Sequence, residues 1–257
     1  MVVRVPRIRN PGTDSRAKMA QPDNVLPVSN RILKALPATS LERLRPHLIS
    51  ETLPVQTVLY RIGQPIRKVH FIQRGIASVI KTMQDGRTVE IGGIGIEGMT
   101  GANALFDGNK AILECVVQVP GEALVIKSDV LKAEMAQDVE LSMLLHAYQS
   151  LTISQLAQTA ACNRLHTLEQ RCCRWLLIAH DSAGNDTFPL THEFLSMMLG
   201  VRRPGVTLAA RSLQQSGLIR YTRGRVNIVD RIGLERAACE CYGTIHQMIE
   251  RLFARRN

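Results

Sequence analysis

Hydrophobic and polar residues alternate over short runs in the first half of the chain and recur at helical spacing in the second half. The alternating runs lie at 57–60, 69–72, 77–81, 88–91, 113–119 and 122–126. Ten of the 18 glycines of the chain fall between Gly63 and Gly121, in the turns between these runs. Short strand-like runs separated by glycine turns predict an antiparallel roll or barrel within residues 29–137.

Two short helices are expected ahead of these strands. Asn30 can cap a helix over 31–36. Thr39, with Glu42 three residues later, matches a capping box for a second helix that ends by Pro46.

Residues 1–28 have four prolines, many basic residues and no hydrophobic period, so they are expected to form a flexible basic tail. Two alternatives stay open for this segment. It is an arm that touches nucleic acid, or it is a leader, with translation beginning at Met19 instead of Met1.

The longest helical pattern covers residues 138–165, with Asp138 as its N-cap. One set of positions follows an alternating four–three spacing: Leu141, Leu145, Tyr148, Thr152, Gln155, Thr159 and Cys162. This heptad spacing predicts a dimerisation helix whose seam is this set. The alternative is a helix that packs on its own roll.

Residues 166–230 are predicted to form a separate helical domain with a hairpin. The expected elements are a helix at 168–180, a loop at 181–186, helices at 192–199 and 203–216, and strands at 218–221 and 225–229. A helical extension at 231–257, with one helix over 231–254, completes the chain.

The helices at 192–199 and 203–216 have the signals of a helix-turn-helix. Thr191 can cap the first helix and Gly200 suits the turn. Pro204 fits the first turn of the second helix and Gly217 fits a left-handed cap after it. On the second helix, Val206, Ala209, Ala210 and Leu213 share one face, while Arg203, Thr207 and Arg211 share the other.

The charge of the chain supports a nucleic-acid partner. The net charge is +10 with a pI near 9.7, and residues 199–231 carry seven arginines against one acid. Arginine suits guanine edges and phosphates, and a basic hairpin tip suits the phosphate backbone. The candidate DNA-binding residues are therefore Thr191, Arg202, Arg203, Thr207, Arg211, Arg223 and Arg225.

These residues resemble the Crp–Fnr superfamily of bacterial transcription regulators. The stretches that carry the resemblance are NRILKALP (30–37), VHFIQRGIAS (69–78), EGMTG (97–101), LTHEFLSMMLGVRR (190–203) and GLIRYTRGRVNIVD (217–230). The resemblance implies an α+β chain with an N-terminal, jelly-roll-like β-roll that resembles cyclic-nucleotide-binding domains, a long dimerisation helix and a C-terminal winged helix-turn-helix. It also implies a dimeric, sequence-specific regulator on a pseudo-palindromic double-stranded DNA operator, with RNA polymerase as a possible further partner.

The sequence departs from this family in two places. Cyclic-nucleotide binders use a Gly-Glu pair and a later Arg-Ser or Arg-Thr, where this chain has Glu97-Gly98 and Ile112-Leu113. A phosphate would lose its bidentate arginine here, so cyclic AMP is not expected to be the effector. Leu208 likewise stands where well-known members have an arginine on the recognition helix. The expected pocket for an unidentified small-molecule effector comprises Glu97, Gly98, Gly101, Ile112 and Leu113.

No metal or other cofactor is predicted. The first cysteine is Cys115, so the N-terminal cysteines of the iron–sulfur branch are absent, and the six cysteines show no CxxC pair. His70, His146 and His166 lack a metal-ligand spacing, and His192-Glu193 lacks the second histidine of a zinc protease. Small buried side chains are the expected role of the cysteines. A redox pair within Cys172–Cys173 or Cys239–Cys241 is the alternative.

The chain has no recognisable secretion signal and no apolar run of about 18 residues, so a cytoplasmic protein without a membrane span is expected. No nucleophile, base or metal signature supports an enzyme. One rival interpretation is a β-roll-regulated signalling protein or enzyme whose C-terminal domain binds a partner other than DNA. A second is a nonspecific architectural DNA binder, which would not need a glycine-rich roll.

Overall fold

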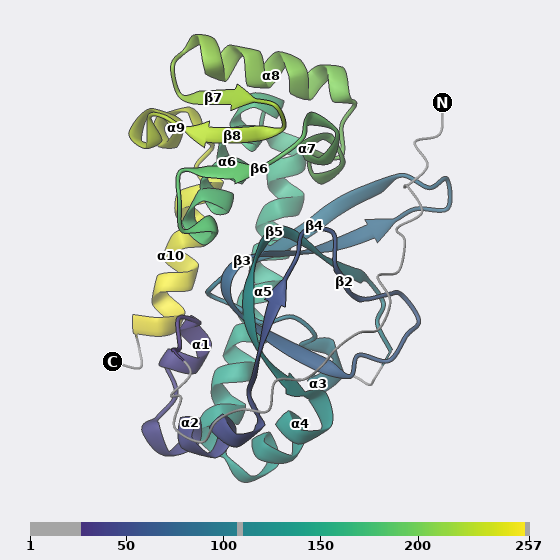
Figure 1. Ribbon diagram of the computed structural model, residues 1–257, viewed down its shortest axis with the longest axis vertical. Helices are drawn as coiled ribbons and strands as arrows, with labels where there is room; N and C mark the ends of the chain where they lie inside the picture. The colour runs from purple at the N-terminus through teal and green to yellow at the C-terminus, as the bar shows by residue number, and fades with distance from the viewer. Residues whose placement is uncertain (1–26, 107–109, 255–257) are drawn as a thin grey trace.

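The glycine-rich part of the chain forms a five-stranded sheet. Every strand pairing in it is antiparallel, which confirms the predicted roll. The computed structural model describes residues 27–106 and 110–254. The strands are β1 (Ile49–Leu53), β2 (Val58–Tyr60), β3 (Lys68–Thr82), β4 (Thr88–Ile94) and β5 (Glu114–Lys127). They lie in the order β1-β5-β3-β4, with β2 also paired to β5 (Figure 1).

Two long strands replace four of the predicted short ones. The runs 69–72 and 77–81 both belong to β3, and the runs 113–119 and 122–126 both belong to β5. Gly75 adopts a φ of +89°, and an added Cβ at Gly121 would lie 1.8 Å from the carbonyl oxygen of Arg74. Register shifts in the β3–β5 pairing fall beside Gly75. These glycines therefore permit irregularities inside paired strands, where the sequence pattern had suggested strand ends.

Short helices precede the sheet: α1 (Arg31–Lys34), α2 (Ala38–Leu44) and the 3-10 turn η1 (Arg45–His47). Asn30 caps α1 as predicted, because its side chain accepts from the backbone N–H groups of Ile32 and Leu33. The capping box predicted at Thr39 is wrong. The helix already begins at Ala38, so Thr39 lies inside its first turn. The predicted basic tail, 1–28, lies outside the described residues except for 27 and 28.

A single long helix connects the two halves of the molecule. After α3 (Asn103–Phe106) and α4 (Ser128–Gln137), the chain forms α5 (Val139–Leu165). The carboxylate of Asp138 accepts from the backbone N–H of Leu141 at 3.0 Å, which confirms the predicted N-cap. Helix α5 runs past the β-roll from the α1–α2 end towards the C-terminal domain (Figure 1).

The predicted dimer seam on α5 is wrong in its residues. Leu141, Leu145, Tyr148 and Cys162 are buried within the protomer, and Thr152, Gln155 and Thr159 line an internal cavity. The reason is that this side of the helix is more apolar and packs against the β-roll of the same chain. A second heptad row, displaced by two residues, is exposed: Val139, Met143, His146, Ser150, Ile153, Ala157, Ala160 and Arg164.

The C-terminal domain combines three helices with a small sheet, as predicted for a winged helix-turn-helix. Its elements are α6 (Leu168–Ala183), β6 (Thr187–Pro189), α7 (His192–Leu199), α8 (Arg203–Gln215), β7 (Ile219–Thr222) and β8 (Arg225–Ile228). The sheet has the order β6-β8-β7, with antiparallel pairs. Strand β6 lies between the predicted loop at 181–186 and α7, in a stretch for which the sequence pattern predicted no element.

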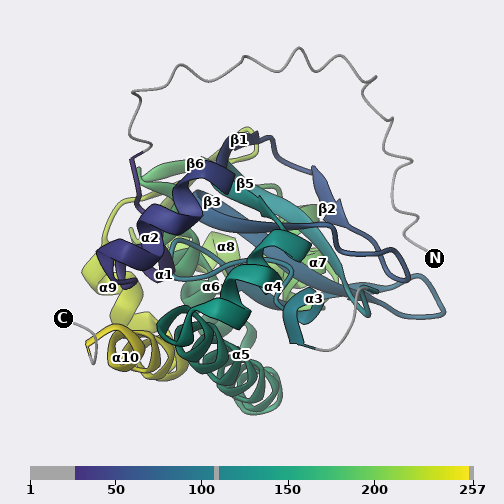
Figure 2. The same cartoon turned by 90° about the horizontal axis from the view of Figure 1, so that it is seen from below.

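The single helix predicted for 231–254 is wrong. The chain forms α9 (Arg231–Ala237) and α10 (Cys241–Ala254), and Ala238 between them has an extended conformation. Helix α10 packs along α5 (Figure 2). Its Glu250 forms a bidentate ion pair with Arg31 of α1 at 2.7 and 3.0 Å. The C-terminal segment therefore contacts the start of the front domain.

The hydrophobic core divides into two large clusters. One spans the C-terminal domain and the adjoining face of β3 and β5, around Trp175 and Phe188. The other joins α1, α2, the sheet, α5 and Phe253 of α10. Within the described residues, no helix is long and apolar enough to span a bilayer.

Candidate nucleic-acid interface and sensor cavity

Helix α8 has one buried and one exposed face. Val206, Ala209, Ala210 and Leu213 are buried against the rest of the domain, which confirms the face predicted to pack inward. Arg203 and Arg211 are exposed on the other side. The helix lies at one end of the molecule, away from α1 and α2 (Figure 1). Its basic face is thus open to a large partner.

The start of α8 is built to attract anions. Arg202 is the N-cap residue, and no side chain caps the free amides of the first turn. The first turn has no acidic residue, while Arg203 is its first member. A helix N-terminus carries partial positive charge, and cations placed there raise the potential further. This end of α8 therefore favours phosphate or electronegative base edges.

The hydroxyl group of Thr207 is less available for contact with a partner than the sequence suggested. Its hydroxyl donates to the backbone carbonyl of Arg203 at 3.1 Å. The same oxygen lies 3.1 Å from Nδ1 of His192 at the start of α7, so it accepts the imidazole proton. Burial, and then the charge of Arg203, lower the pKa of His192, which favours the neutral ring. The Thr207 methyl group, rather than its hydroxyl proton, is therefore left for contact with a partner on this face.

Thr191 serves the first helix of the motif. Its hydroxyl oxygen accepts from the backbone N–H of Phe194 at 3.1 Å and so caps α7. The backbone N–H of Leu190 donates to the carbonyl of Gly224 in the β7–β8 turn at 2.8 Å. These contacts bring the start of α7 and the tip of the hairpin together.

The β7–β8 hairpin presents two arginines at its tip. Thr222 pairs with Arg225, and the two residues between them, Arg223 and Gly224, have φ values of +47° and +76°. Two consecutive left-handed residues match the turn that suits a tight hairpin. Arg223 and Arg225 are exposed, and Arg225 is also 3.4 Å from the carbonyl oxygen of Thr187. The hairpin therefore has the form of a basic wing.

Two exposed residues of this surface were not among the predicted site residues. The side of α8 that carries Arg203 and Arg211 also carries Leu208, which is 66% exposed. Arg220 is exposed on β7. The sequence analysis noted Leu208 only as a missing arginine. The available signal was its position on the side of the helix away from the apolar face of Val206, Ala209, Ala210 and Leu213. An exposed leucine can contact a thymine methyl group.

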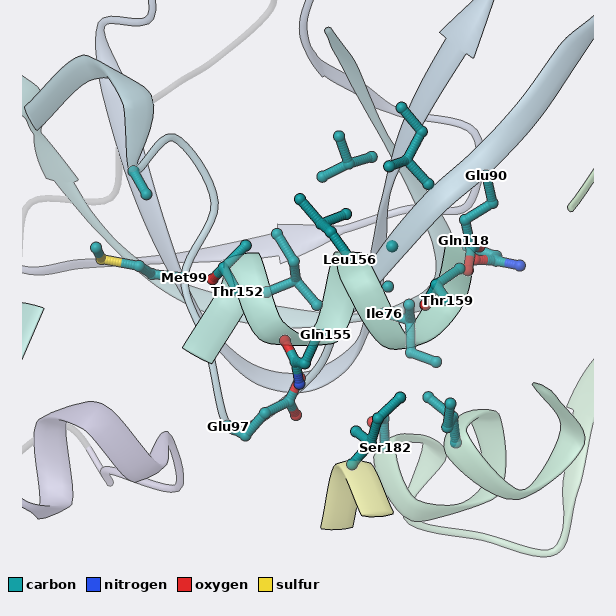
Figure 3. Close-up of a pocket in the computed structure, with 18 of the residues that line it drawn as sticks. Ile76, Glu90, Glu97, Met99, Gln118, Thr152, Gln155, Leu156, Thr159 and Ser182 are labelled. Atoms are coloured by element: carbon teal, nitrogen blue, oxygen red, sulfur yellow. The ribbon is translucent and has the colours of Figure 1, made fainter. Parts of the chain in front are cut away.

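A cavity of about 540 Å³ lies between the β-roll and helices α5 and α6 (Figure 3). Of the five predicted pocket residues, Glu97, Gly101, Ile112 and Leu113 lie on its wall. Most of the wall is apolar, as at Ile76 and Leu156, so the cavity suits a largely apolar molecule.

The remaining predicted residue, Gly98, lies behind the wall against α5. An added Cβ at Gly98 would be 2.3 Å from the hydroxyl oxygen of Tyr148. That hydroxyl accepts from the N–H of Met99 at 3.1 Å and donates to its carbonyl at 3.2 Å. The Glu97–Met99 loop is thus hydrogen-bonded to α5, the helix that leads to the C-terminal domain.

Three carboxyl groups line the cavity, those of Glu90, Glu97 and Asp181. Burial raises the pKa of Glu90, against hydrogen bonds from Ser78 and Trp175. Burial also raises the pKa of Glu97, whose Oε1 accepts from the N–H of Gly95 at 2.9 Å. The nearby amide nitrogen of Gln118 is buried without a hydrogen-bond partner. The carboxyl groups of Glu90 and Glu97 on the cavity wall are therefore weaker acids than exposed glutamates.

The cavity wall also has three arginines, each already engaged. Arg31 pairs with Glu250, Arg174 donates to Thr159 at 2.9 Å, and Arg171 donates to the carbonyl of Leu199. None of them stands at the Ile112-Leu113 position where the resemblance places its phosphate ligand.

The C-terminal domain contacts the β-roll directly. Trp175 of α6 and Glu90 of β4 both line the cavity, and α6 packs against β3 and β5. Gly200, the left-handed residue between α7 and α8, packs closely on β4, because an added Cβ would lie 3.0 Å from a methyl group of Val89. The turn of the helix-turn-helix therefore rests on the strand that forms part of the cavity wall.

The histidines singled out by sequence lie in different environments. His70 is buried, with Nδ1 3.0 Å from the hydroxyl of Thr100. His146 is exposed on α5, with Nδ1 2.7 Å from the carbonyl of Ser142. His166 lies beside three cysteines at the end of α5. Only His166 is close to other residues that bind metals.

Two family models match the chain. A Crp-like helix-turn-helix domain matches residues 170–237, and a cyclic nucleotide-binding domain matches residues 50–138. No curated protein is significantly similar to it in sequence.

Solved structures share the fold at low sequence identity. FixK2 from Bradyrhizobium japonicum is 16% identical, with a TM-score of 0.63 over 75% of this chain and 98% of its own. A CRP-family transcriptional regulator from Thermus thermophilus is 21% identical, with a TM-score of 0.61 over 73% and 96%. The c-di-GMP-responsive global regulator CLP from Xanthomonas campestris is 18% identical, with a TM-score of 0.59 over 75% and 99%.

Proposed function

Because this chain belongs to the Crp–Fnr superfamily and has the architecture of a Crp-family transcription regulator, we propose that it is a dimer that binds specific double-stranded DNA sequences. The observation that carries this proposal is the exposed face of α8, where Arg203, Leu208 and Arg211 lie together beside a basic wing. Such a helix suits the major groove, and such a wing suits the adjacent phosphates.

The proposed roles divide the predicted residues into two groups. Arg203 and the Thr207 methyl group lie near the start of α8, the part of a recognition helix that usually meets base edges. Arg202, Arg223 and Arg225 are assigned to phosphates, together with the N-terminal amides of α8. Arg211, two turns into the helix, is also assigned to phosphate. Thr191 supports the interface by capping α7.

The proposed dimer forms through the exposed heptad row of α5. Met143 and Ile153 are 57% and 60% exposed, large values for apolar side chains, and Ala157 and Ala160 continue the row with small side chains. Apolar and small residues at alternating four–three spacing allow two helices to pack closely. A twofold dimer then requires a pseudo-palindromic operator with half-sites about one helical turn apart.

The proposed effector is a largely apolar small molecule. Apolar residues form most of the cavity wall, and the carboxyl groups of Glu90 and Glu97 disfavour an anion. Because β4 contacts both the cavity and the turn after α7, it is the proposed route from effector to DNA-binding domain.

The other interpretations have less support. A C-terminal domain that binds a partner other than DNA would not need the basic α8 face or the wing, and a nonspecific binder would not need the cavity. We assign no catalytic activity and place the protein in the cytoplasm with its DNA. RNA polymerase remains a proposed partner through the family resemblance alone.

The test is selection from a pool of random duplexes with the purified full chain. We expect enrichment of one motif with twofold symmetry, which a scrambled duplex of equal length should not replace as a competitor. Equal binding to all duplexes would contradict sequence specificity. A motif without twofold symmetry would contradict the dimer and leave DNA reading by α8 in place.

A further inference from the structure

Three cysteines and a histidine converge where the end of α5 meets the break between α9 and α10. Their ligand atoms, on Cys162, His166, Cys239 and Cys241, all lie within 4.8 Å of one another. The Sγ atoms of Cys162 and Cys239 are 3.6 Å apart, and Sγ of Cys241 is 3.5 Å from Nδ1 of His166. The sequence predicted no metal ligands because the two pairs are separated by more than 70 residues. Only the fold joins them.

These distances match the edges of a zinc tetrahedron. With Zn–S bonds of about 2.3 Å and Zn–N bonds of about 2.0–2.1 Å, ideal geometry places two sulfurs about 3.8 Å apart and a sulfur and a nitrogen about 3.5 Å apart. We propose that Cys162, His166, Cys239 and Cys241 form a zinc site of the Cys₃His type. Four protein ligands leave no open position, so the site is structural.

The local backbone explains how the ligands reach one point. Cys162 and His166 are four residues apart at the end of α5, so they lie on the same side of that helix. Cys239 and Cys241 are two residues apart. In a continuous helix their side chains would be rotated by about 200° about the axis and would lie on nearly opposite sides. The break between α9 and α10 removes this conflict. The interruption that the sequence pattern missed is therefore what allows both thiols to face the other pair.

Groups around the cluster fit a metal site. Nε2 of His166 lies 3.1 Å from the carboxylate of Glu240, which holds Nδ1 towards the sulfurs. A carboxylate on the far nitrogen of a ligating histidine is a common support for zinc. The amide of Gln158 donates to Sγ of Cys241 at 3.0 Å, and Arg174 lies beside Cys162. Three thiolates and one Zn²⁺ leave a net charge of −1, which this arginine partly offsets.

The packing of these thiols differs from that of the other cysteines. Cys172 and Cys173 are buried among the apolar side chains of the C-terminal core. Cys162, Cys239 and Cys241, by contrast, form a buried cluster whose described apolar members are these three residues alone. Burial as small apolar side chains therefore explains Cys172 and Cys173 better than it explains the cluster. A zinc ion here would tie α10 to the end of α5, next to the DNA-binding domain.

The proposal is tested on the full chain, purified under reducing conditions without chelator, by elemental mass spectrometry. We expect one zinc per chain, released when a mercurial reagent modifies the thiols. Cys239→Ser and Cys241→Ser should lose the bound zinc, whereas Cys173→Ser, the matched control, should retain it. Circular dichroism of each variant separates loss of the site from loss of the fold.

Two further measurements apply where a cysteine variant does not fold. Glu240→Ala changes an exposed side chain and should weaken zinc binding by roughly 10- to 100-fold. Replacement of zinc by Co²⁺ should give thiolate charge-transfer bands and the visible spectrum of a tetrahedral site.

Three results would overturn the proposal. The first is a reduced, folded chain that contains no zinc and takes up none when it is added. The second is unchanged zinc affinity in a folded Cys239→Ser chain. The third is iron with inorganic sulfide, or a Cys162–Cys239 disulfide with no zinc uptake after reduction, because either assigns the cluster to another chemistry.

Discussion

Nδ1 of His192, at the start of α7, lies 3.1 Å from the hydroxyl oxygen of Thr207 on α8. This contact joins the two helices of the helix-turn-helix, and the hydroxyl proton of Thr207 is already donated to Arg203. The ring of His192 also packs edge-on against Tyr221 of β7, with centroids 4.5 Å apart. One histidine thus connects the first helix, the recognition helix and the wing.

Thr207→Val should destabilise the C-terminal domain by about 1 kcal/mol, because Nδ1 of His192 loses its acceptor. Thr207→Ser keeps the hydroxyl and should retain stability, but it should lower preference at one base pair if the methyl group contacts a thymine. Thermal unfolding and binding isotherms on specific duplexes measure the two effects. Equal stability of the Val variant would contradict a structural role for the hydroxyl.

Arg203 and Arg223 should have different effects on DNA binding. Arg203→Ala is expected to cost roughly 1–3 kcal/mol on the specific site and to relax preference at one base pair. Arg223→Asn keeps a residue that tolerates the left-handed turn. It should weaken binding to all duplexes alike and lower the salt slope by about one unit.

Lys127→Ala, an exposed change at the end of β5, is the control for lost positive charge. Salt-dependent isotherms on specific and scrambled duplexes provide the measurement. If Arg203→Ala weakened both duplexes equally and Arg223→Asn changed base preference, the proposed orientation of α8 would be wrong.

Ile153→Glu should separate the proposed dimer. The substitution places two carboxylates at the seam, and a cost of roughly 3 kcal/mol would raise the dimer dissociation constant about 100-fold. Ile49→Glu is the matched control, because Ile49 is 66% exposed on β1, away from α5. Sedimentation equilibrium gives the constants. A dimer equally stable in both variants would place the interface elsewhere.

The cavity should bind an uncharged apolar probe and not cyclic AMP. Leu156→Trp fills the space between α5 and the sheet, so it should abolish fluorescence enhancement of N-phenylnaphthylamine by the protein. Ile49→Trp on the surface should leave the enhancement unchanged. Titration calorimetry with cyclic AMP should give no saturable heat. Micromolar binding of cyclic AMP would show that Ile112-Leu113 does not prevent phosphate recognition.

His70 should make the front domain less stable at low pH. Burial lowers the pKa of His70 to about 4, the charge of Glu51 raises it and that of Lys68 lowers it further, and its buried neighbour is Thr100. In the unfolded chain the histidine pKa is about 6.5, so the unfolded state binds the proton first as the pH falls. The contribution of His70 is therefore complete above about pH 6.5 and is lost down to about pH 4, by roughly 3 kcal/mol at most.

Urea unfolding between these pH values measures the effect. His70→Gln should remove this part of the pH dependence, and His47→Gln, at an exposed position, should retain it. A His70→Gln chain with the same pH dependence as the parent would assign the effect to other groups.

Local sequence signals were sufficient for much of the molecule. Asn30, Asp138 and Gly217 have the cap positions that their side chains or backbone freedom predict. The two helices of the helix-turn-helix and the β7–β8 hairpin follow from short-range spacing and turn chemistry, because the turns that define them join residues close in sequence. The alternation of β-strands was also visible for the same reason.

Tertiary contacts decided which faces are buried and which distant residues meet, because the hydrophobic period of the sequence leaves both ambiguous. Helix α5 has two heptad rows. The more apolar row is buried because it packs against the β-roll of the same chain. The break after α9 places two cysteines near Cys162 and His166, far away in sequence. Sequence period specifies which residues share a face. Which neighbour covers that face, and which distant side chains meet there, depends on long-range packing that periodicity does not record.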